Sequence, residues 1–192
     1  MPHQNVSIKD NPRYKIVEKL LWIDLEMTGL DVEKEKIIEI AAVVTDLNFE
    51  ILGKLDLVIQ QSESILKKMH PWCQETFTSN GLLKKVQKSK IDLETAEKKL
   101  LKFIDKYFEK DIPIILAGSS IHFDRKFILK CLQNLENRLH YRMLDVTSFK
   151  ILFSKKYNKS LETKNGAAHL AMSDILHSIE ELKFYTKFIK KR

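Results

Sequence analysis

The chain contains 192 residues, 44% of them hydrophobic and 31% charged, which fits a globular domain with a buried core and excludes disordered and fibrous proteins. The formal net charge of +7 would help the protein bind a polyanion such as nucleic acid, with a solvated lysine-rich surface as the alternative. No apolar run approaches the length of a membrane span, so we expect no membrane partner.

Residues 1–19 mix prolines with charges of both signs and show no periodicity, which predicts a loose leader before a single domain over residues 20–192. Asp10 and Glu18 argue against a mitochondrial transit peptide, which lacks acids. The chain has only two cysteines, too few for a disulfide framework. We therefore expect a cytoplasmic protein, with the mitochondrial matrix as the alternative.

The first half of the domain is rich in strands. Short apolar segments predict strands over residues 20–25, 37–45 and 51–59. The connections between them are short, which favours an antiparallel arrangement because hairpin loops cannot join parallel strands.

The second half alternates helices with strands. Residues 62–90 are predicted as short helical pieces broken at Pro71 and Gly81, and residues 92–108 as a longer helix with Asp92 as its N-cap. The remaining predicted elements are a strand over 112–117, a helix over 122–132, a strand over 141–146, a helix from Thr147 and a helix over 167–190. The sequence thus predicts an α/β fold, a mixed five-stranded sheet with three antiparallel strands and two further strands, flanked by helices.

Two carboxylates stand out in the first predicted strand. Asp24 and Glu26 are two residues apart, so both side chains would point to one face. Their neighbours are apolar, and buried carboxylates are costly unless a metal ion or another partner satisfies them. The spacing alone is weak, because composition predicts about three or four acid-x-acid triples in such a chain. Salt-bridged acids or acids at a strand end remain the alternative.

Three more residues are candidates for the same site. Asp124 follows the fourth predicted strand near the start of a helix, where the alternative is an acid favoured by the helix dipole. Asp174 borders the apolar face of the last predicted helix and needs a partner. His169 lies five residues earlier, about 140° around an ideal helix from Asp174. We therefore expect it at the loose helix start, free to reach substrate, rather than stacked beside Asp174.

These residue types suit metal-dependent hydrolysis. Hard carboxylate oxygens suit Mg²⁺ or Mn²⁺, and no cluster of cysteines and histidines suggests zinc. Two divalent ions about 4 Å apart can activate water and stabilise the leaving oxygen of a phosphodiester. A histidine, with an ordinary pKa near 6.5, is suited to accept the proton of that water.

The order of these residues, D-x-E, then D, then H-x₄-D, resembles that of the DEDDh 3′→5′ exonucleases, which have a ribonuclease-H-like fold. Within that superfamily, the segments WIDLEMTGLD, HYRMLDV and GAAHLAMSDI are similar to those of the oligoribonuclease family over roughly residues 20–190. The resemblance implies that Asp24, Glu26, Asp124 and Asp174 hold two divalent metal ions and that His169 is the general base. It also implies that 5′-mononucleotides are removed from the 3′ ends of very short RNA.

The resemblance further implies a substrate pocket and a homodimer. Leu30 and Trp72 match positions that bracket the bases of short single-stranded RNA, although Trp72 alone would suggest ordinary packing. Positions near the terminal phosphate are matched by Ser120, Arg142 and Thr147. Tyr141 matches a catalytic tyrosine that reaches the active site of the partner subunit; without the resemblance it would be an ordinary strand residue.

The chain departs from the family pattern in a few places. Ser119 stands where an asparagine is expected, Leu170 where a polar residue is usual, and Ser173 where an acid is common; residues 153–166 also form a shorter segment than is typical. These departures affect substrate positioning rather than the metal ligands or the base. Two rival functions are a general or proofreading 3′→5′ exonuclease acting on longer RNA or DNA and a nucleic-acid-binding module without catalysis.

Overall fold

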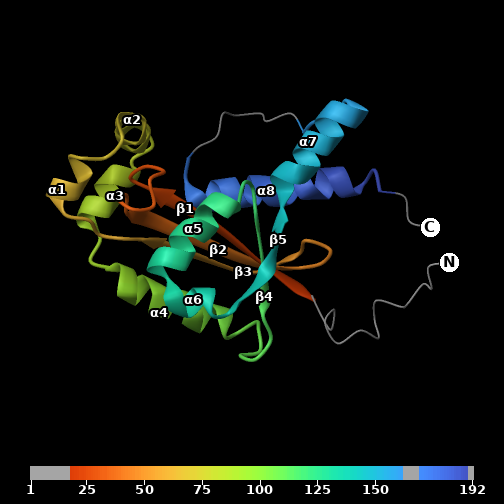
Figure 1. The fold of residues 1–192 in the computed structure, drawn as a ribbon, viewed down its shortest axis with the longest axis horizontal. Helices are drawn as coiled ribbons and strands as arrows, with labels where there is room; N and C mark the ends of the chain where they lie inside the picture. Colours follow the sequence, from red (N-terminus) through yellow and green to blue (C-terminus); the bar gives the residue numbers. More distant parts are fainter. Residues whose placement is uncertain (1–17, 162–168, 190–192) are drawn as a thin grey trace.

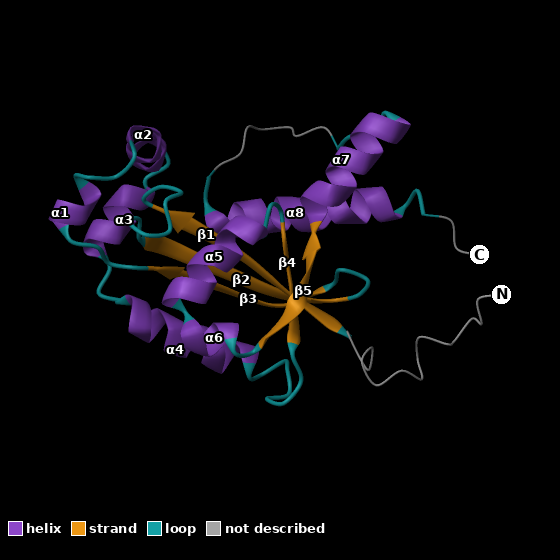
Figure 2. Cartoon of the chain, in the orientation of Figure 1, coloured by secondary structure: helices purple, strands orange, loops and turns teal. Residues whose placement is uncertain are grey.

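The computed structural model describes residues 18–161 and 169–189, and a five-stranded sheet lies at its centre (Figure 2). Its strands are β1 (Lys19–Met27), β2 (Ile37–Asp46), β3 (Ile51–Val58), β4 (Ile114–Gly118) and β5 (Leu139–Asp145), in the spatial order β3-β2-β1-β4-β5. β2 is antiparallel to both β1 and β3, whereas β4 runs parallel to β1 and β5. The predicted mixed sheet is confirmed.

Helices cover both faces and one end of the sheet (Figure 1). They are α1 (Glu63–Leu66), α2 (Pro71–Ser79), α3 (Leu82–Lys88), α4 (Leu93–Ile104), α5 (His122–Cys131), α6 (Gln133–Glu136), α7 (Val146–Tyr157) and α8 (Ala171–Thr186). One face packs against α4, α5 and α6, and the other against α8 and the start of α7. The short helices α1, α2 and α3 gather at one end of the sheet.

Alternation along β1 explains why the sheet is buried on both faces. Leu21, Ile23 and Leu25 belong to the core beneath α4 and α5, whereas Leu20 and Trp22 belong to the core beneath α8. Side chains two apart on a strand share a face, so β1 gives apolar residues to both faces of the sheet. The α8 face of β1 turns polar after Trp22, and this change positions the site.

The helices α1, α2 and α3 have a small core of their own. Met69, Phe77, Leu82 and Val86 are among the buried residues that pack there against Ile38 of β2. Pro71 is the first residue of α2, where its missing N–H leaves no helical hydrogen bond unmade. Gly81 precedes α3 with a φ of +81°, a left-handed conformation that favours glycine. The two predicted breaks are therefore confirmed as boundaries of helices.

Some boundaries differ from the sequence prediction. α8 begins at Ala171 rather than near residue 167, because tertiary contacts described below fix its start. The four-residue helix α6 was not predicted. β1 begins at Lys19, inside the predicted leader, since Lys19 pairs with Asp46; the rest of the leader except Glu18 lies outside the described residues. Within the part of the chain that is described, no helix is long and apolar enough to cross a membrane.

Candidate metal centre and substrate site

β1 presents the first two candidate ligands side by side. Asp24 and Glu26 continue the row of Leu20 and Trp22 on the α8 face of the sheet. In the antiparallel pairing with β2, Asp24 lies opposite Ala41 and Glu26 opposite Glu39. The small side chain of Ala41 leaves room above the sheet, so carboxylates can extend toward α8.

α8 supplies the third carboxylate. Asp174 lies in the first turn of this helix, which packs along β1 and β2. One oxygen from each of Asp24, Glu26 and Asp174 lies within 4.8 Å of the others. Residues 150 positions apart in the sequence thus form one acidic cluster.

The fourth carboxylate, Asp124, comes from α5, which packs on the face of the sheet opposite α8. It lies in the first turn of α5 and is buried. Its Oδ1 accepts a hydrogen bond of 2.9 Å from the backbone N–H of Leu25, between the two β1 acids. This bond fixes Asp124 beside Asp24, and its charge is the largest of the neighbouring charges acting on Asp24.

The cluster is electrostatically unfavourable without a counter-charge. Burial raises the pKa of Asp24 well above its usual range, and neighbouring carboxylates, Asp124 first, raise it further. Burial and the same kind of repulsion raise the pKa of Glu26 to about 8, and burial raises that of Asp124 to about 7. Burial also raises the pKa of Asp174, while the charges of two histidines oppose the shift. The neighbouring charges that raise the pKa values of Asp24 and Glu26 belong to carboxylates.

This donor set fits a divalent cation. Convergent carboxylate oxygens are ligands that Mg²⁺ and Mn²⁺ prefer, and a cation would relieve the repulsion that burial imposes on the four acids. No other group of three or more potential ligands meets the same distance criterion among residues 18–161 and 169–189. The acidic cluster is therefore the place where this structure can bind metal.

His169 lies just before α8 rather than on it. Its φ of +45° is a left-handed conformation that is uncommon for a residue other than glycine. Its ring meets the ring of Trp72 edge-on, with centroids 4.9 Å apart, and its carbonyl accepts a hydrogen bond of 2.7 Å from Asn80 Nδ2. The expected position at the helix start is close to the one observed, but the predicted helical angle to Asp174 does not apply because His169 lies outside the helix.

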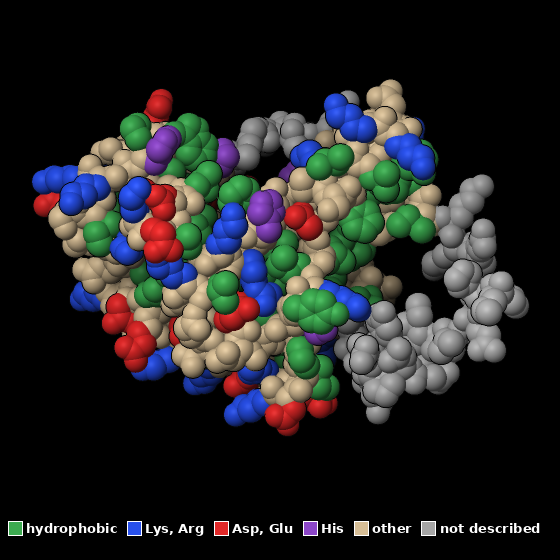
Figure 3. Space-filling model, in the orientation of Figure 1, with side chains coloured by type: hydrophobic (Ala, Val, Ile, Leu, Met, Phe, Trp, Pro, Cys, Tyr) green, Lys and Arg blue, Asp and Glu red, His purple; other side chains and the backbone are tan. Residues whose placement is uncertain are grey.

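The two predicted base-contacting residues are exposed at the same end of the sheet. Leu30 is 70% exposed and Trp72 is 51% exposed, so both side chains are accessible to a ligand. The N–H of His70 donates to the carbonyl of Thr28 at 2.9 Å. This bond joins the two segments that carry Leu30 and Trp72, each of which lies two residues further along its segment. Hydrophobic and histidine side chains gather on the surface around α2, whereas lysines and arginines are scattered over the visible face (Figure 3).

Three residues were predicted to lie near the terminal phosphate, and the structure brings two of them, Ser120 and Thr147, into contact. The N–H of Ser120 donates to Thr147 Oγ1 and to Asp145 Oδ1, both at 2.9 Å, and the Ser120 and Thr147 hydroxyls lie 3.1 Å apart. Arg142 lies on β5, three residues or about 10 Å of strand before Asp145. Its guanidinium lies 5.2 Å from the ring centroid of Tyr141.

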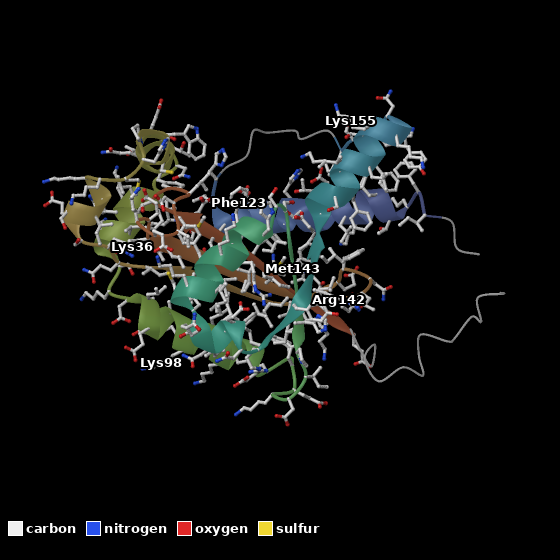
Figure 4. The ribbon with its side chains drawn as sticks, viewed as in Figure 1. Lys36, Lys98, Phe123, Arg142, Met143 and Lys155 are labelled. Carbon is white, nitrogen blue, oxygen red and sulfur yellow. The ribbon has the colours of Figure 1, made fainter. Side chains whose placement is uncertain are left out.

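Tyr141 lies on the edge strand of the sheet, away from the acidic cluster of its own chain. It is 74% exposed and stacks on His140. Met143 and Phe123 are also exposed apolar residues, on β5 and at the start of α5 (Figure 4). The outer side of β5 has no neighbouring strand in the described sheet, so this edge and its apolar side chains are open to a partner.

Two of the departures from the family pattern, Ser119 and Leu170, have local explanations. Ser119 Oγ lies 2.9 Å from Ser178 Oγ, and Ser178 in turn donates to the carbonyl of Asp174, so Ser119 contacts the helix that carries a candidate ligand. Leu170 packs into the core formed by α1, α2 and α3, which accounts for an apolar residue after His169. Ser173 is exposed, and nothing in the structure explains its identity. The shortened segment 153–166 lies partly outside the described residues.

Sequence reasoning missed three residues that support the site: Glu39, Asn80 and Asp145. Glu39 is buried, and its Oε2 accepts a hydrogen bond of 2.9 Å from the N–H of Ala171. Its signal was visible, because it is an acid inside the apolar run IIEIAAVV, as Asp24 is in its own strand. Asn80 acts through the distant carbonyl of His169, which left no local signal. Asp145 also accepts from the distant Ser120 N–H, and its local signal was its place as the N-cap of α7.

The raised pKa values predict a pH-dependent stability for the metal-free protein. Groups such as Glu26 and Asp124 keep their protons in the folded state at pH values where the unfolded chain has released them. Their contribution to stability is therefore complete below about pH 4 and is lost as the pH rises through about 7 to 8. We expect the Tm in a chelating buffer to fall between about pH 5 and pH 8.5.

Divalent cations should reverse this loss. Mg²⁺ or Mn²⁺ should raise the Tm strongly at about pH 8.5 and little at about pH 5, because protonated carboxylates bind metal poorly. Circular dichroism melting curves with and without the ion measure both effects. A Tm gain that is equal at the two pH values would contradict binding at the acidic cluster.

Comparison with known proteins identifies the class first. A family model described as exonuclease matches residues 21–182, a span that includes all four carboxylates and His169. Oligoribonuclease from Francisella tularensis subsp. tularensis is 46% identical over 173 residues, covering 88% of this chain and 94% of the relative. Oligoribonuclease from Haemophilus influenzae is 44% identical over 176 residues, covering 91% and 96%. The chain belongs to the oligoribonuclease family of exonucleases.

Solved structures agree on the fold. The zinc-bound complex of Escherichia coli exonuclease I with single-stranded DNA superposes with a TM-score of 0.67 at 14% identity, covering 90% of this chain and 41% of that one. A product-bound exonuclease I gives a TM-score of 0.64 at 14% identity, covering 88% and 43%. The chain therefore shares the exonuclease fold while spanning less than half the length of these structures.

Proposed function

We propose that this protein is a 3′→5′ exoribonuclease that degrades very short single-stranded RNA to 5′-mononucleotides. The observation that carries the proposal is the meeting of Asp24, Glu26 and Asp174 within 4.8 Å, next to a helix start where His169 contacts the exposed ring of Trp72. An acidic cluster suited to metal, a histidine suited to act as a base and an exposed indole ring thus lie at one end of the sheet. The names of the relatives, at 43% to 46% identity, support RNA as the substrate.

Asp24, Glu26, Asp124 and Asp174 would hold two divalent ions, Mg²⁺ or Mn²⁺. When bound, these ions lower the pKa of a water and stabilise charge on the leaving 3′ oxygen. The protein contributes a rigid set of ligands from three elements. Asp124 is oriented by the Leu25 N–H, which leaves its second oxygen available as a ligand.

His169 would accept the proton of the attacking water. It precedes the helix that carries Asp174, and its left-handed backbone places its ring against Trp72 instead of along the helix. A base that touches the stacking surface is held near the nucleotide whose phosphodiester is cleaved. The same contact restricts the rotation of the imidazole.

Leu30 and Trp72 would bracket the bases at the 3′ end, and stacking of this kind tolerates any base. Ser120, Thr147 and Arg142 would lie toward the terminal phosphate. The Ser120 and Thr147 hydroxyls already form a pair that can donate to phosphate oxygens. A phosphate recognised a short distance from the stacked bases would favour a substrate only a few nucleotides long.

A homodimer would complete this site. The open edge of β5 and the exposed side chains of Tyr141 and Met143 suit pairing with a second copy, in which Tyr141 would reach the active site of the partner. We also propose that residues 20–192 form a single exonuclease domain, since one sheet joins the described parts, and that the protein acts in the cytoplasm.

One assay separates this function from its rivals. RNAs of two to about twenty nucleotides, labelled at the 5′ end, are incubated with Mg²⁺ or Mn²⁺, and the initial rates are compared. We expect the shortest RNAs to be cleaved fastest, with 5′-mononucleotides as products, and a chelator to stop the reaction.

The other outcomes are equally informative. Equal or faster cleavage of the longest RNA, or of DNA, would favour a general or proofreading exonuclease. Binding of RNA without cleavage in any divalent ion would favour a binding module and refute the proposal. Release of the labelled 5′-mononucleotide from a longer RNA before any shortened labelled RNA appears would contradict the 3′→5′ direction.

A further inference from the structure

The segment between His169 and Ala171 is held by side chains from two elements distant in sequence. Asn80, at the C-cap of α2, donates from Nδ2 to the carbonyl of His169 at 2.7 Å. Glu39, on β2, accepts at Oε2 from the N–H of Ala171 at 2.9 Å. Between these two bonds, Leu170 packs into the core formed by α1, α2 and α3.

The contact from Asn80 connects His169, the proposed base, to α2. α2 carries Trp72 in its first turn and ends at Asn80, and both residues contact His169, one through the ring and one through the backbone. Asn80 is itself oriented, because its Oδ1 accepts from the Leu82 N–H at 3.0 Å. The Asn80 side chain is thus held at its oxygen and donates from its nitrogen to the His169 carbonyl. This bond stabilises the left-handed backbone of His169, which is otherwise unfavourable.

The contact from Glu39 connects the start of α8 to β1. The N-cap residue of α8, Leu170, offers no side chain to the free N–H groups of the first turn, and Glu39 takes that role from another element. Glu39 also lies opposite Glu26 in the β1–β2 pairing and is only 1% exposed. The place where α8 begins, and with it Asp174 in the first turn, is thereby tied to the strand pair that carries Glu26.

We propose that Asn80 and Glu39 are positioning residues that hold His169 and Asp174 at fixed positions relative to α2 and β1. The inference rests on the proposed function of His169 as base and of Asp174 as ligand. Neither positioning residue touches substrate. Each acts by fixing one end of a three-residue segment, so that the base, the ligand and Trp72 keep a constant geometry.

Asn80→Asp is a selective test, because it keeps an oxygen for the Leu82 N–H and removes the donor to His169. We expect kcat for a dinucleotide, taken at the pH where it is highest, to fall about tenfold to a hundredfold, as for a displacement of about 1 Å. KM should stay within about twofold, since Trp72 and Leu30 remain.

Two substitutions of Glu39 form a matched pair. Glu39→Gln keeps an oxygen that can accept from the Ala171 N–H, whereas Glu39→Leu has a similar volume and cannot accept. Glu39→Leu should lose kcat as Asn80→Asp does, and Glu39→Gln should retain about tenfold more kcat than Glu39→Leu. Asn134→Ala is the control for general loosening, because it removes a hydrogen bond from Asn134 Nδ2 to buried Glu97, between α6 and α4; it should lower the Tm without lowering kcat.

A second measurement does not depend on catalysis or metal. In the metal-free protein, amide hydrogen exchange at Ala171 and Asp174 should accelerate about tenfold in Asn80→Asp and Glu39→Leu, while α4 stays protected. Unchanged exchange there, or an unchanged kcat with only the Tm lowered, would overturn the positioning role. A wild-type protein that cleaves no RNA would refute the proposed function, and the exchange result would still decide whether these residues anchor the segment.

Discussion

Asp24→Asn should abolish turnover and at the same time raise the Tm of the metal-free protein. Asparagine keeps the shape of the side chain but removes a charge needed to bind a divalent ion, so we expect kcat to fall about a thousandfold or more. The same change removes a buried carboxylate whose pKa is raised by burial and by neighbouring acids, Asp124 first. At about pH 8 the folded state should therefore gain stability without metal.

Asp92→Asn is the matched control for this prediction. Asp92 belongs to another acid-x-acid pair, caps α4 through the Thr95 N–H, and has its pKa lowered by that contact. Asparagine is also a good N-cap, so kcat should be unchanged and the Tm unchanged or slightly lower. Steady-state kinetics and melting curves in a chelator give both readouts. Asp24→Asn with near-normal kcat, or with a lower metal-free Tm, would contradict the assignment of the acidic cluster.

His169→Ala should have the second-largest effect on catalysis. Loss of a positioned general base costs about a hundredfold to ten-thousandfold in rate. The metal ligands remain, so Mg²⁺ or Mn²⁺ should still raise the Tm at high pH. Initial rates measured across a pH series, with the shortest RNA as substrate, test this expectation.

His177, which lies on α8 with Asp174, provides the comparison. Its charge, like that of His169, opposes the raised pKa of Asp174, but the ring contact with Trp72 belongs to His169. His177→Ala therefore reproduces the loss of a nearby positive charge without removing the base, and we expect kcat to change by less than about threefold. Equal losses in the two variants would indicate an electrostatic effect on Asp174 instead of proton transfer.

The strands were predictable because their signal is local. Apolar runs bounded by polar turns placed all five strands within a few residues of their observed bounds, and antiparallel order followed from short connections. The start of α8 was misplaced because its N-cap residue, Leu170, makes no capping hydrogen bond with its side chain; Glu39, 132 residues from Ala171, accepts from the Ala171 N–H instead. α6 was missed because a helix of four residues has no periodicity to detect.

The candidate site, too, was predictable from the sequence only in part. Asp24 and Glu26 were found from an apolar strand that contains acids, and the order of Asp124, His169 and Asp174 came from family likeness. The structure brings three of these acids within 4.8 Å and places Asp124 against the backbone between the first two. The support from Asn80 could not be predicted, because a hydrogen bond to a distant carbonyl depends on tertiary structure alone. Nor does the isolated chain show what Tyr141 contacts, since the proposed contact lies on a second copy.

The double role of α2 limits which insertions and deletions this protein can tolerate. Trp72 and Asn80 lie at opposite ends of one short helix and contact the same residue. One residue added between them would turn Asn80 by about 100° and move it along the axis by about 1.5 Å, away from the carbonyl that it holds. The length of α2 is therefore constrained during evolution.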